Sequence, residues 1–346
     1  MQLRGAVSFA FLLCAPLAVA QVETAISEQH SLDLPAIKSY HDGGIRDIEA
    51  IGERNIGCGR GFGNWYSLER QIAMGKEYSS RVEATSRFVK DPVVTAYVNQ
   101  IGQNIVRNSD SQVPFTIKVI DSDDINAFAL PGGFFYVDVG LILAAESEAE
   151  LAGVMAHEIA HVAACHSARG RTRGQLMNLA SLPLMMIGGP IGYVAYEGLT
   201  VATPFTYMKF SRRFESDADF LGVQYMYKAG YDPQALTSFF EKVKALEKRK
   251  EGVVVKAFRT HPQTPQRIEN TRQEIATLLP PLTQYKVDTS EFQEIKARLN
   301  QAQGGLRIGT PLRRNPALRR REPASSDEST RPGESGNFPA PEIPER

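Results

Sequence analysis

The chain is predicted to adopt an α+β fold that is mostly helical, with a small antiparallel or mixed sheet. Three patterns in the sequence support this class. Apolar residues recur at helical spacing through most of residues 66–302. One alternating segment, Phe115–Ile120, is typical of a strand. Two short apolar runs, 126–130 and 134–139, flank Pro131-Gly132-Gly133 and indicate two strands joined by a turn.

The composition is that of a folded protein with one sizeable core. The chain has 346 residues, of which 42% are hydrophobic, and its mean hydropathy is −0.25. This is enough apolar material for a single domain with appended segments. Basic and acidic residues are equal in number, at 39 each. We therefore expect no positively charged footprint for nucleic acid and no nucleic-acid partner.

The N-terminal segment has the pattern of a cleaved export signal. Arg4 gives a positive start, residues 9–13 are apolar, and Ala18-Val19-Ala20 is a small-x-small cleavage site. The apolar run is too short to serve as a permanent membrane anchor. We therefore expect cleavage after Ala20 and export of the mature chain, which begins at Gln21, to an oxidising compartment.

Export also changes how the cysteines are interpreted. Cys14 leaves with the signal, whereas Cys58 and Cys165 remain in the mature chain. In an oxidising compartment these two can pair, or both can be free and buried, and the sequence leaves the two alternatives open.

Changes in composition divide the chain into four regions. The segment after about residue 303 is rich in proline, arginine and serine and cannot build a core, so we expect it to be disordered. The expected regions are a signal peptide at 1–20, an irregular lead-in at 21–65, a folded domain at 66–302 and the tail at 303–346.

The stretch His157-Glu158-Ile159-Ala160-His161 is the most informative motif. It falls on a predicted helix that opens with the capping box Ser147-x-x-Glu150. Residues four apart on a helix share a face, so two imidazoles can reach one zinc ion. Glu158 is rotated by roughly 100° from His157, which places its carboxylate where a water on the metal would lie.

A third ligand is expected from the next amphipathic helix, because a catalytic zinc site has three protein ligands. Glu215 and Asp219 are four residues apart there and share a face. Glu215 can bind the metal, and Asp219 can accept the spare N–H of a ligating histidine. In isolation such a pair is more often a solvated helix face, but next to the histidine motif we favour the metal site.

Four motifs in this order resemble a known family: 126–133 (NAFALPGG), 157–161 (HEIAH), Glu215-x-x-Ala218-Asp219 and 260–267 (THPQTPQR). The chain is similar to the CAAX prenyl protease, HtpX and BepA family of zinc metallopeptidases, which are gluzincins. Within the family it looks most like the soluble, periplasmic BepA-like members. The resemblance covers roughly residues 65–295.

The resemblance implies a zincin-like metalloprotease core with one Zn²⁺ per chain. It implies zinc on His157, His161 and Glu215, with Glu158 as the catalytic base and Asp219 supporting a ligating histidine. His261 and Arg267 are expected either to cap the zinc or to contact substrate and the oxyanion. A further implied role is an edge strand that adds extended substrate as another strand, formed by Phe134, Phe135, Tyr136 and Val137.

The expected function is zinc-dependent endopeptidase activity on unfolded or misassembled envelope proteins in the periplasm, as part of protein quality control. The alternative is a periplasmic chaperone or assembly factor with latent proteolytic activity. Expected partners are unfolded or extended polypeptides and the outer-membrane assembly machinery. The apolar stretch 176–207 leaves two interpretations open: a membrane-contacting hairpin, or a buried hairpin that covers the active site.

Overall fold

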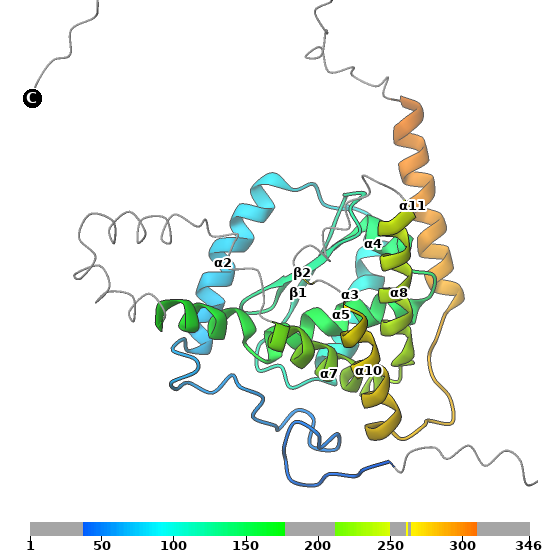
Figure 1. Ribbon diagram of the computed structural model, residues 1–346. Helices are drawn as coiled ribbons and strands as arrows, with labels where there is room; N and C mark the ends of the chain where they lie inside the picture. The colour runs from blue at the N-terminus through cyan, green and yellow to red at the C-terminus, as the bar shows by residue number, and fades with distance from the viewer. Residues whose placement is uncertain (1–36, 177–211, 250–260, 262–263, 310–346) are drawn as a thin grey trace, which may run out of the picture. The chain divides into compact units, whose positions relative to one another are not determined.

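The computed structural model describes residues 37–176, 212–249, 261 and 264–309 (Figure 1). The expected signal peptide, nearly all of the apolar stretch 176–207 and the tail beyond 309 lie outside the described residues. The chain divides into two units, Met1–Ala302 and Gln303–Arg346. The site and the core described below belong to the first unit.

The described residues confirm a mostly helical α+β fold with a small mixed sheet. The helices are α2 (Leu68–Thr85), α3 (Pro92–Arg107), α4 (Val139–Ala144), α5 (Glu148–Ala163), α7 (Arg212–Lys228), α8 (Gln234–Arg249), α10 (Pro265–Leu278) and α11 (Ser290–Gly309). The strands are β1 (Thr116–Ile120), β2 (Ala127–Leu130) and β3 (Phe134–Asp138).

Helix starts follow the local sequence closely. Ser67, Asp91, Ser147 and Thr264 each accept a hydrogen bond from a backbone N–H in the first turn of the helix that follows. These contacts satisfy donors that the helix itself leaves unpaired. Proline at the first position of α3 and α10 adds a backbone angle that already suits a helix.

The last helix is longer than the sequence predicts. α11 continues to Gly309, so residues 303–309, which the sequence assigns to the tail, are helical. Gln, Leu and Arg in this stretch are good helix formers, and they outweigh the two glycines at 304 and 305.

The sheet order is β1-β3-β2, with β1 parallel to β3 and β2 antiparallel to it. β3 contains Phe134–Val137 and is therefore the central strand. The prediction that these four residues form a substrate-binding edge is wrong, because pairing on both sides uses the backbone groups that an edge would offer. In this sheet the edge strand that contacts α5 is β2.

Helix α5 runs through the centre of the fold, with the sheet on one side and α7 and α10 on the other (Figure 1). All sixteen of its residues are buried. Helices α3, α7 and α8 and strand β2 pack around it. A helix buried on every side is expected to be apolar throughout, so the charged and histidine side chains of α5 need partners from its neighbours.

The lead-in segment is fastened to this core by a buried polar network. The guanidinium of Arg54 pairs with Asp110 and donates from Nη1 to Gln224 Oε1 at 2.7 Å. Asp110 also accepts from the hydroxyl of Tyr225 at 2.8 Å. The described part of the lead-in is thus part of the packed structure, although it consists of turns and bends.

A disulfide between Cys58 and Cys165 makes a second attachment. It joins the lead-in to the residue two positions after the end of α5 and resolves the alternative that the sequence left open. The bond closes a separation of 107 residues.

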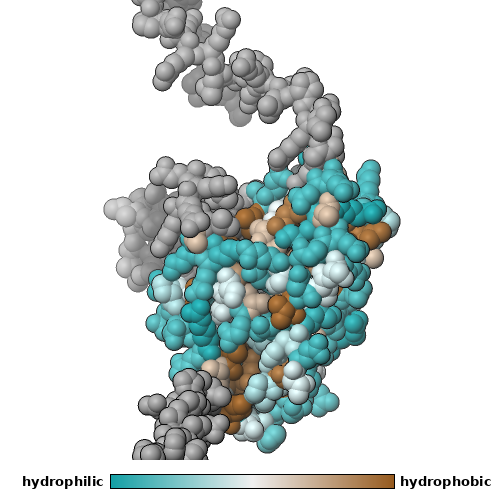
Figure 2. Space-filling view, turned by 90° about the vertical axis from the view of Figure 1, so that its right-hand side faces the viewer, coloured by the Kyte–Doolittle hydropathy of each residue, from teal (hydrophilic) through white to brown (hydrophobic). Residues whose placement is uncertain are grey.

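In the part of the chain that the structure describes, no helix combines the length and the apolar character needed to cross a membrane. The face shown in Figure 2 is mostly hydrophilic, with apolar residues in small, separated patches. Scattered patches of this kind are normal on a folded protein and indicate no particular partner.

Replacing both Cys58 and Cys165 with serine should lower the free energy of unfolding by about 2–4 kcal/mol, because a long loop is no longer closed in the unfolded chain. Urea unfolding followed by circular dichroism measures this difference, and the wild type treated with reductant is the matched comparison. Equal unfolding midpoints for the variant and the oxidised wild type would show that the bond contributes no net stability.

Candidate metal centre

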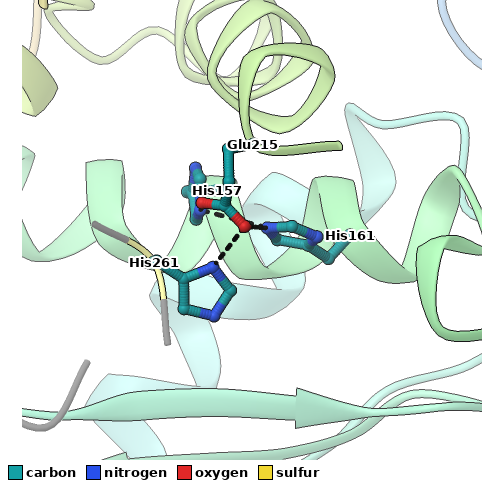
Figure 3. Close-up of side chains that lie close together, drawn as sticks. All are labelled: His157, His161, Glu215 and His261. Atoms are coloured by element: carbon teal, nitrogen blue, oxygen red, sulfur yellow. Dashed lines mark hydrogen bonds and ion pairs between the residues drawn. The ribbon is translucent and has the colours of Figure 1, made fainter. Parts of the chain in front are cut away.

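Helix α5 presents two histidines to one point. His157 and His161 lie one turn apart, and their Nε2 atoms are 3.1 Å from each other (Figure 3). Both residues are 3% exposed. Two ligands of one zinc ion at tetrahedral angles stand about 3.3 Å apart, given bonds of about 2.0–2.1 Å. The pair therefore has the spacing that a shared metal requires.

Glu215 and His261 complete the cluster. Glu215 lies on α7. Its carboxylate Oε2 is 3.6 Å from His157 Nε2, and its Oε1 is 3.6 Å from His161 Nε2. His261 precedes α10, and its Nδ1 is 2.8 Å from Glu215 Oε1 (Figure 3). One ligand atom from each of these four residues lies within 4.8 Å of all the others.

A layer of charged groups lies behind the cluster. His157 Nδ1 is 3.0 Å from Asp219 Oδ1. Arg267 reaches both carboxylates of α7: Nε and Nη2 contact Asp219 at 2.7 Å each, and Nη1 contacts Glu215 at 3.0 Å. The planar guanidinium thus holds the two carboxylates in one fixed relation. The sequence does not predict these contacts of Arg267 with the two carboxylates, which come in addition to the expected role near zinc or substrate.

Glu158 points away from this layer, toward the sheet. Its Oε2 accepts the backbone N–H of Ala129 on β2 at 3.3 Å, and its Oε1 is 3.8 Å from His261 Nε2. Burial raises the pKa of the Glu158 carboxyl above its usual range. The sequence motif predicts that Glu158 faces the metal, but Ala129 was not expected as its partner, since no pattern in β2 marks that N–H.

The charges of the site are unbalanced without a cation. Three buried carboxylates, Glu158, Glu215 and Asp219, face the single guanidinium of Arg267 among the described groups in direct contact with the cluster. Buried charges are costly unless they are paired. A divalent cation would supply the two positive charges that this group of four lacks.

The protonation preferences fit a metal as well. Burial holds the pKa of His161 well below its usual range, which favours the neutral imidazole that binds metals. Burial opposes ionisation of Glu215, but contacts with His157 and His261 hold its pKa well below the usual range. Burial likewise opposes charging of His157, yet Asp219 and Glu215 raise its pKa to about 9. In the absence of a cation, a proton on His157 supplies part of the positive charge that balances the neighbouring carboxylates.

The comparison with known families agrees with this geometry. The model of peptidase family M48 matches residues 92–275, a span that includes the two histidines, both α7 carboxylates and Arg267. The chain belongs to peptidase family M48. The resemblance to metallopeptidases that the motifs suggested is thereby confirmed.

Two groups of relatives are named for protease activity. The chain is 30% identical to the beta-barrel assembly-enhancing protease of Escherichia coli over 248 residues, which are 69% of this chain and 50% of the relative. It is 34% identical to a putative protease of the same name from Vibrio cholerae, over 64% of this chain and 47% of the relative. The mitochondrial metalloendopeptidase OMA1 of Schizosaccharomyces pombe is 31% identical, over 57% and 56% respectively. The chain spans about half the length of these relatives.

Replacing Arg267 with lysine should lower the affinity for metal by about 10–100-fold, the range typical when an outer partner of a ligand is lost, because an ammonium cannot hold two carboxylates with a planar fork. Competition with a chromophoric chelator measures the change. Arg272→Lys is the matched control, since Arg272 lies on the same helix in an exposed ion pair with Glu241. Equal affinities for both variants would show that Arg267 does not hold the ligand set.

Proposed function

We propose that this protein is a zinc-dependent endopeptidase in which His157, His161 and Glu215 hold the metal and Glu158 is the general base. The observation that carries the proposal is the convergence of two imidazoles of α5 and one carboxylate of α7, while Glu158 faces the edge of the sheet. Nitrogen and oxygen donors in this number are the set that zinc takes in catalytic sites.

When bound, zinc supplies a Lewis acid for the scissile carbonyl and acidifies a water molecule. The remaining work falls to the protein. Glu158 accepts the proton of the attacking water and delivers it to the leaving amine. Its raised pKa, which results from burial, suits a carboxyl that must hold a proton between the two steps. Asp219 fixes His157 through Nδ1, and Arg267 keeps Asp219 and Glu215 in place.

The substrate is proposed to be an extended polypeptide that lies along β2. Residues of β2 alternate in the direction of their backbone groups, and the N–H of Ala129 points to Glu158 rather than to β3. A segment that pairs with this edge would bring its backbone close to the catalytic carboxylate. Recognition of this kind reads the backbone more than the side chains, which favours unfolded chains.

We further propose that the mature chain acts in the periplasm on unfolded or misassembled envelope proteins. The export-signal pattern of residues 1–20 and the Cys58–Cys165 disulfide support an oxidising compartment. The bacterial relatives are named for enhancing beta-barrel assembly, which supports outer-membrane assembly machinery as a partner. Assembly-factor activity with latent proteolysis is the second candidate, and the contact of His261 with Glu215 favours it.

Glu158→Gln should abolish cleavage of an unfolded substrate such as casein and leave zinc content unchanged, because the amide cannot accept the proton and Glu158 is not in the ligand set.

Glu215→Ala should lose zinc and activity together, because two histidines alone make an incomplete site. Metal analysis of each purified variant alongside the casein assay tests both statements. Proteolysis by Glu158→Gln near the wild-type rate would disprove the role of Glu158 as base.

His261→Ala should raise basal cleavage of casein or of the enzyme itself. His261 lies 2.8 Å from Glu215 and within reach of the same metal, so in the resting state it competes for the position that substrate and water need. Cleavage rates at equal zinc content give the measurement. If His261 instead stabilises the transition state, kcat falls with zinc content unchanged, and that result would reject the capping role but retain the metal site.

A further inference from the structure

We propose that His166 is a positioning residue that fixes the tautomer and the orientation of the metal ligand His161. This inference rests on the proposed metal site. The Nδ1 atom of His166 is 2.9 Å from Nδ1 of His161, on the side of that ring opposite the cluster. His166 is fully buried, and the endopeptidase mechanism above gives it no task.

The direction of this hydrogen bond follows from the role of His161. A histidine that binds a metal through Nε2 uses the lone pair of that atom, so its proton is on Nδ1. His161 Nδ1 therefore donates, and Nδ1 of His166 must accept. His166 then carries its own proton on Nε2, which lies 3.9 Å from Asp217 Oδ2. Each ring nitrogen of His161 and His166 is thus assigned either a proton or a lone pair.

The backbone is arranged to bring His166 to this position. On an unbroken helix, residues five apart are separated by about 140°, so the two rings would not meet. α5 ends at Ala163, and the chain is helical again from His166 to residue 176. Between them Cys165 has a φ of +52°, the only positive φ of a non-glycine residue in the described part of the chain. That conformation costs energy for a residue with a Cβ, and such costs cluster at functional sites.

Two further contacts hold the ring once it is there. The disulfide to Cys58 fastens the strained residue Cys165. The imidazole of His166 stacks on Phe214 of α7, with ring centroids 4.5 Å apart and planes inclined by 17°. Phe214 immediately precedes the proposed ligand Glu215, so α7 positions both the carboxylate in front of His161 and the ring behind it.

The two proposed histidine ligands thus receive different partners. His157 meets the carboxylate of Asp219 at 3.0 Å, the usual partner of a metal-binding histidine. His161 meets an imidazole, which accepts the same hydrogen bond without adding negative charge. Because the described cluster already contains three buried carboxylates, a neutral acceptor at this position avoids a fourth.

Two substitutions separate positioning from mere packing. His166→Phe keeps the ring and its stacking on Phe214 but removes the acceptor. His166→Asn loses the stacking but places Oδ1 where Nδ1 lay. We expect His166→Phe to bind zinc about 10–100-fold more weakly than the wild type, whereas His166→Asn binds zinc more tightly than His166→Phe despite lower thermal stability.

The measurement is a titration with Zn²⁺ alone in competition with a chromophoric chelator, on the full chain carrying Glu158→Gln to prevent self-cleavage. Thermal unfolding of the metal-free forms reports packing, and His41→Phe, at an exposed position, is the control for the same exchange elsewhere. An affinity of His166→Phe equal to that of the Glu158→Gln parent, or the opposite order of the two variants, would overturn the inference. Failure of the Glu158→Gln parent to bind zinc would instead overturn the proposed metal site.

Discussion

The complete burial of α5 is the constraint on which the rest of the structure depends. A helix with no exposed residue cannot satisfy a polar side chain with bulk water, so each one requires a partner from another element. At the start of α5, Glu148 accepts from the hydroxyls of Tyr97 and Tyr231 at 2.7 Å each, and from Thr289 at 2.6 Å. At its end, the two histidines and Glu158 meet α7, His261 and β2. The same requirement for partners therefore shapes both ends of α5: the start, where Glu148 ties neighbouring elements together, and the end, which carries the candidate metal centre.

Close packing of α7 on α5 brings the carboxylates of α7 to the histidines of α5. Gly222 of α7 faces the backbone of His157, and an added Cβ would lie 3.3 Å from its Cα and N atoms. A larger residue at 222 would push the helices apart and draw Glu215 and Asp219 away from the histidines. The metal site thus depends on backbone distance between helices as much as on the ligand types.

The sequence predicted the parts of the site that are set within single helices. Spacing of four residues on a predicted helix was sufficient to place His157 with His161 and Glu215 with Asp219, and the capping residue of α5 was recognisable from its pattern. The central position of β3 could not be predicted in this way. Alternation identifies a strand, but its neighbours depend on the parallel pairing with β1, which the chain makes only after passing through β2. The expected peptide-binding edge was therefore placed on β3, which is the central strand of the sheet.

Contacts between distant side chains were also beyond the sequence. Arg267 was recognisable as part of a motif, but its contacts with two carboxylates depend on how α10 lies against α7. The position of His166 depends on one backbone angle at Cys165, and the type of residue there predicts the opposite, since cysteine rarely adopts a positive φ. Local patterns thus located the proposed ligands, whereas the groups that contact them from behind became visible only in three dimensions.

His261 and Arg267 belong to one short segment, but Arg267 lies within α10 and His261 precedes it. Arg267 lies in the first turn of α10, where Thr264 accepts its backbone N–H, and its guanidinium is anchored by two carboxylates. His261 precedes that cap, and its imidazole contacts Glu215 of the cluster (Figure 3). A movement of His261 would not require α10 to shift, because the helix start is fixed by its own cap. The proposed ligand set can therefore stay in place while access to it changes, which is the condition that the proposed latent protease must meet.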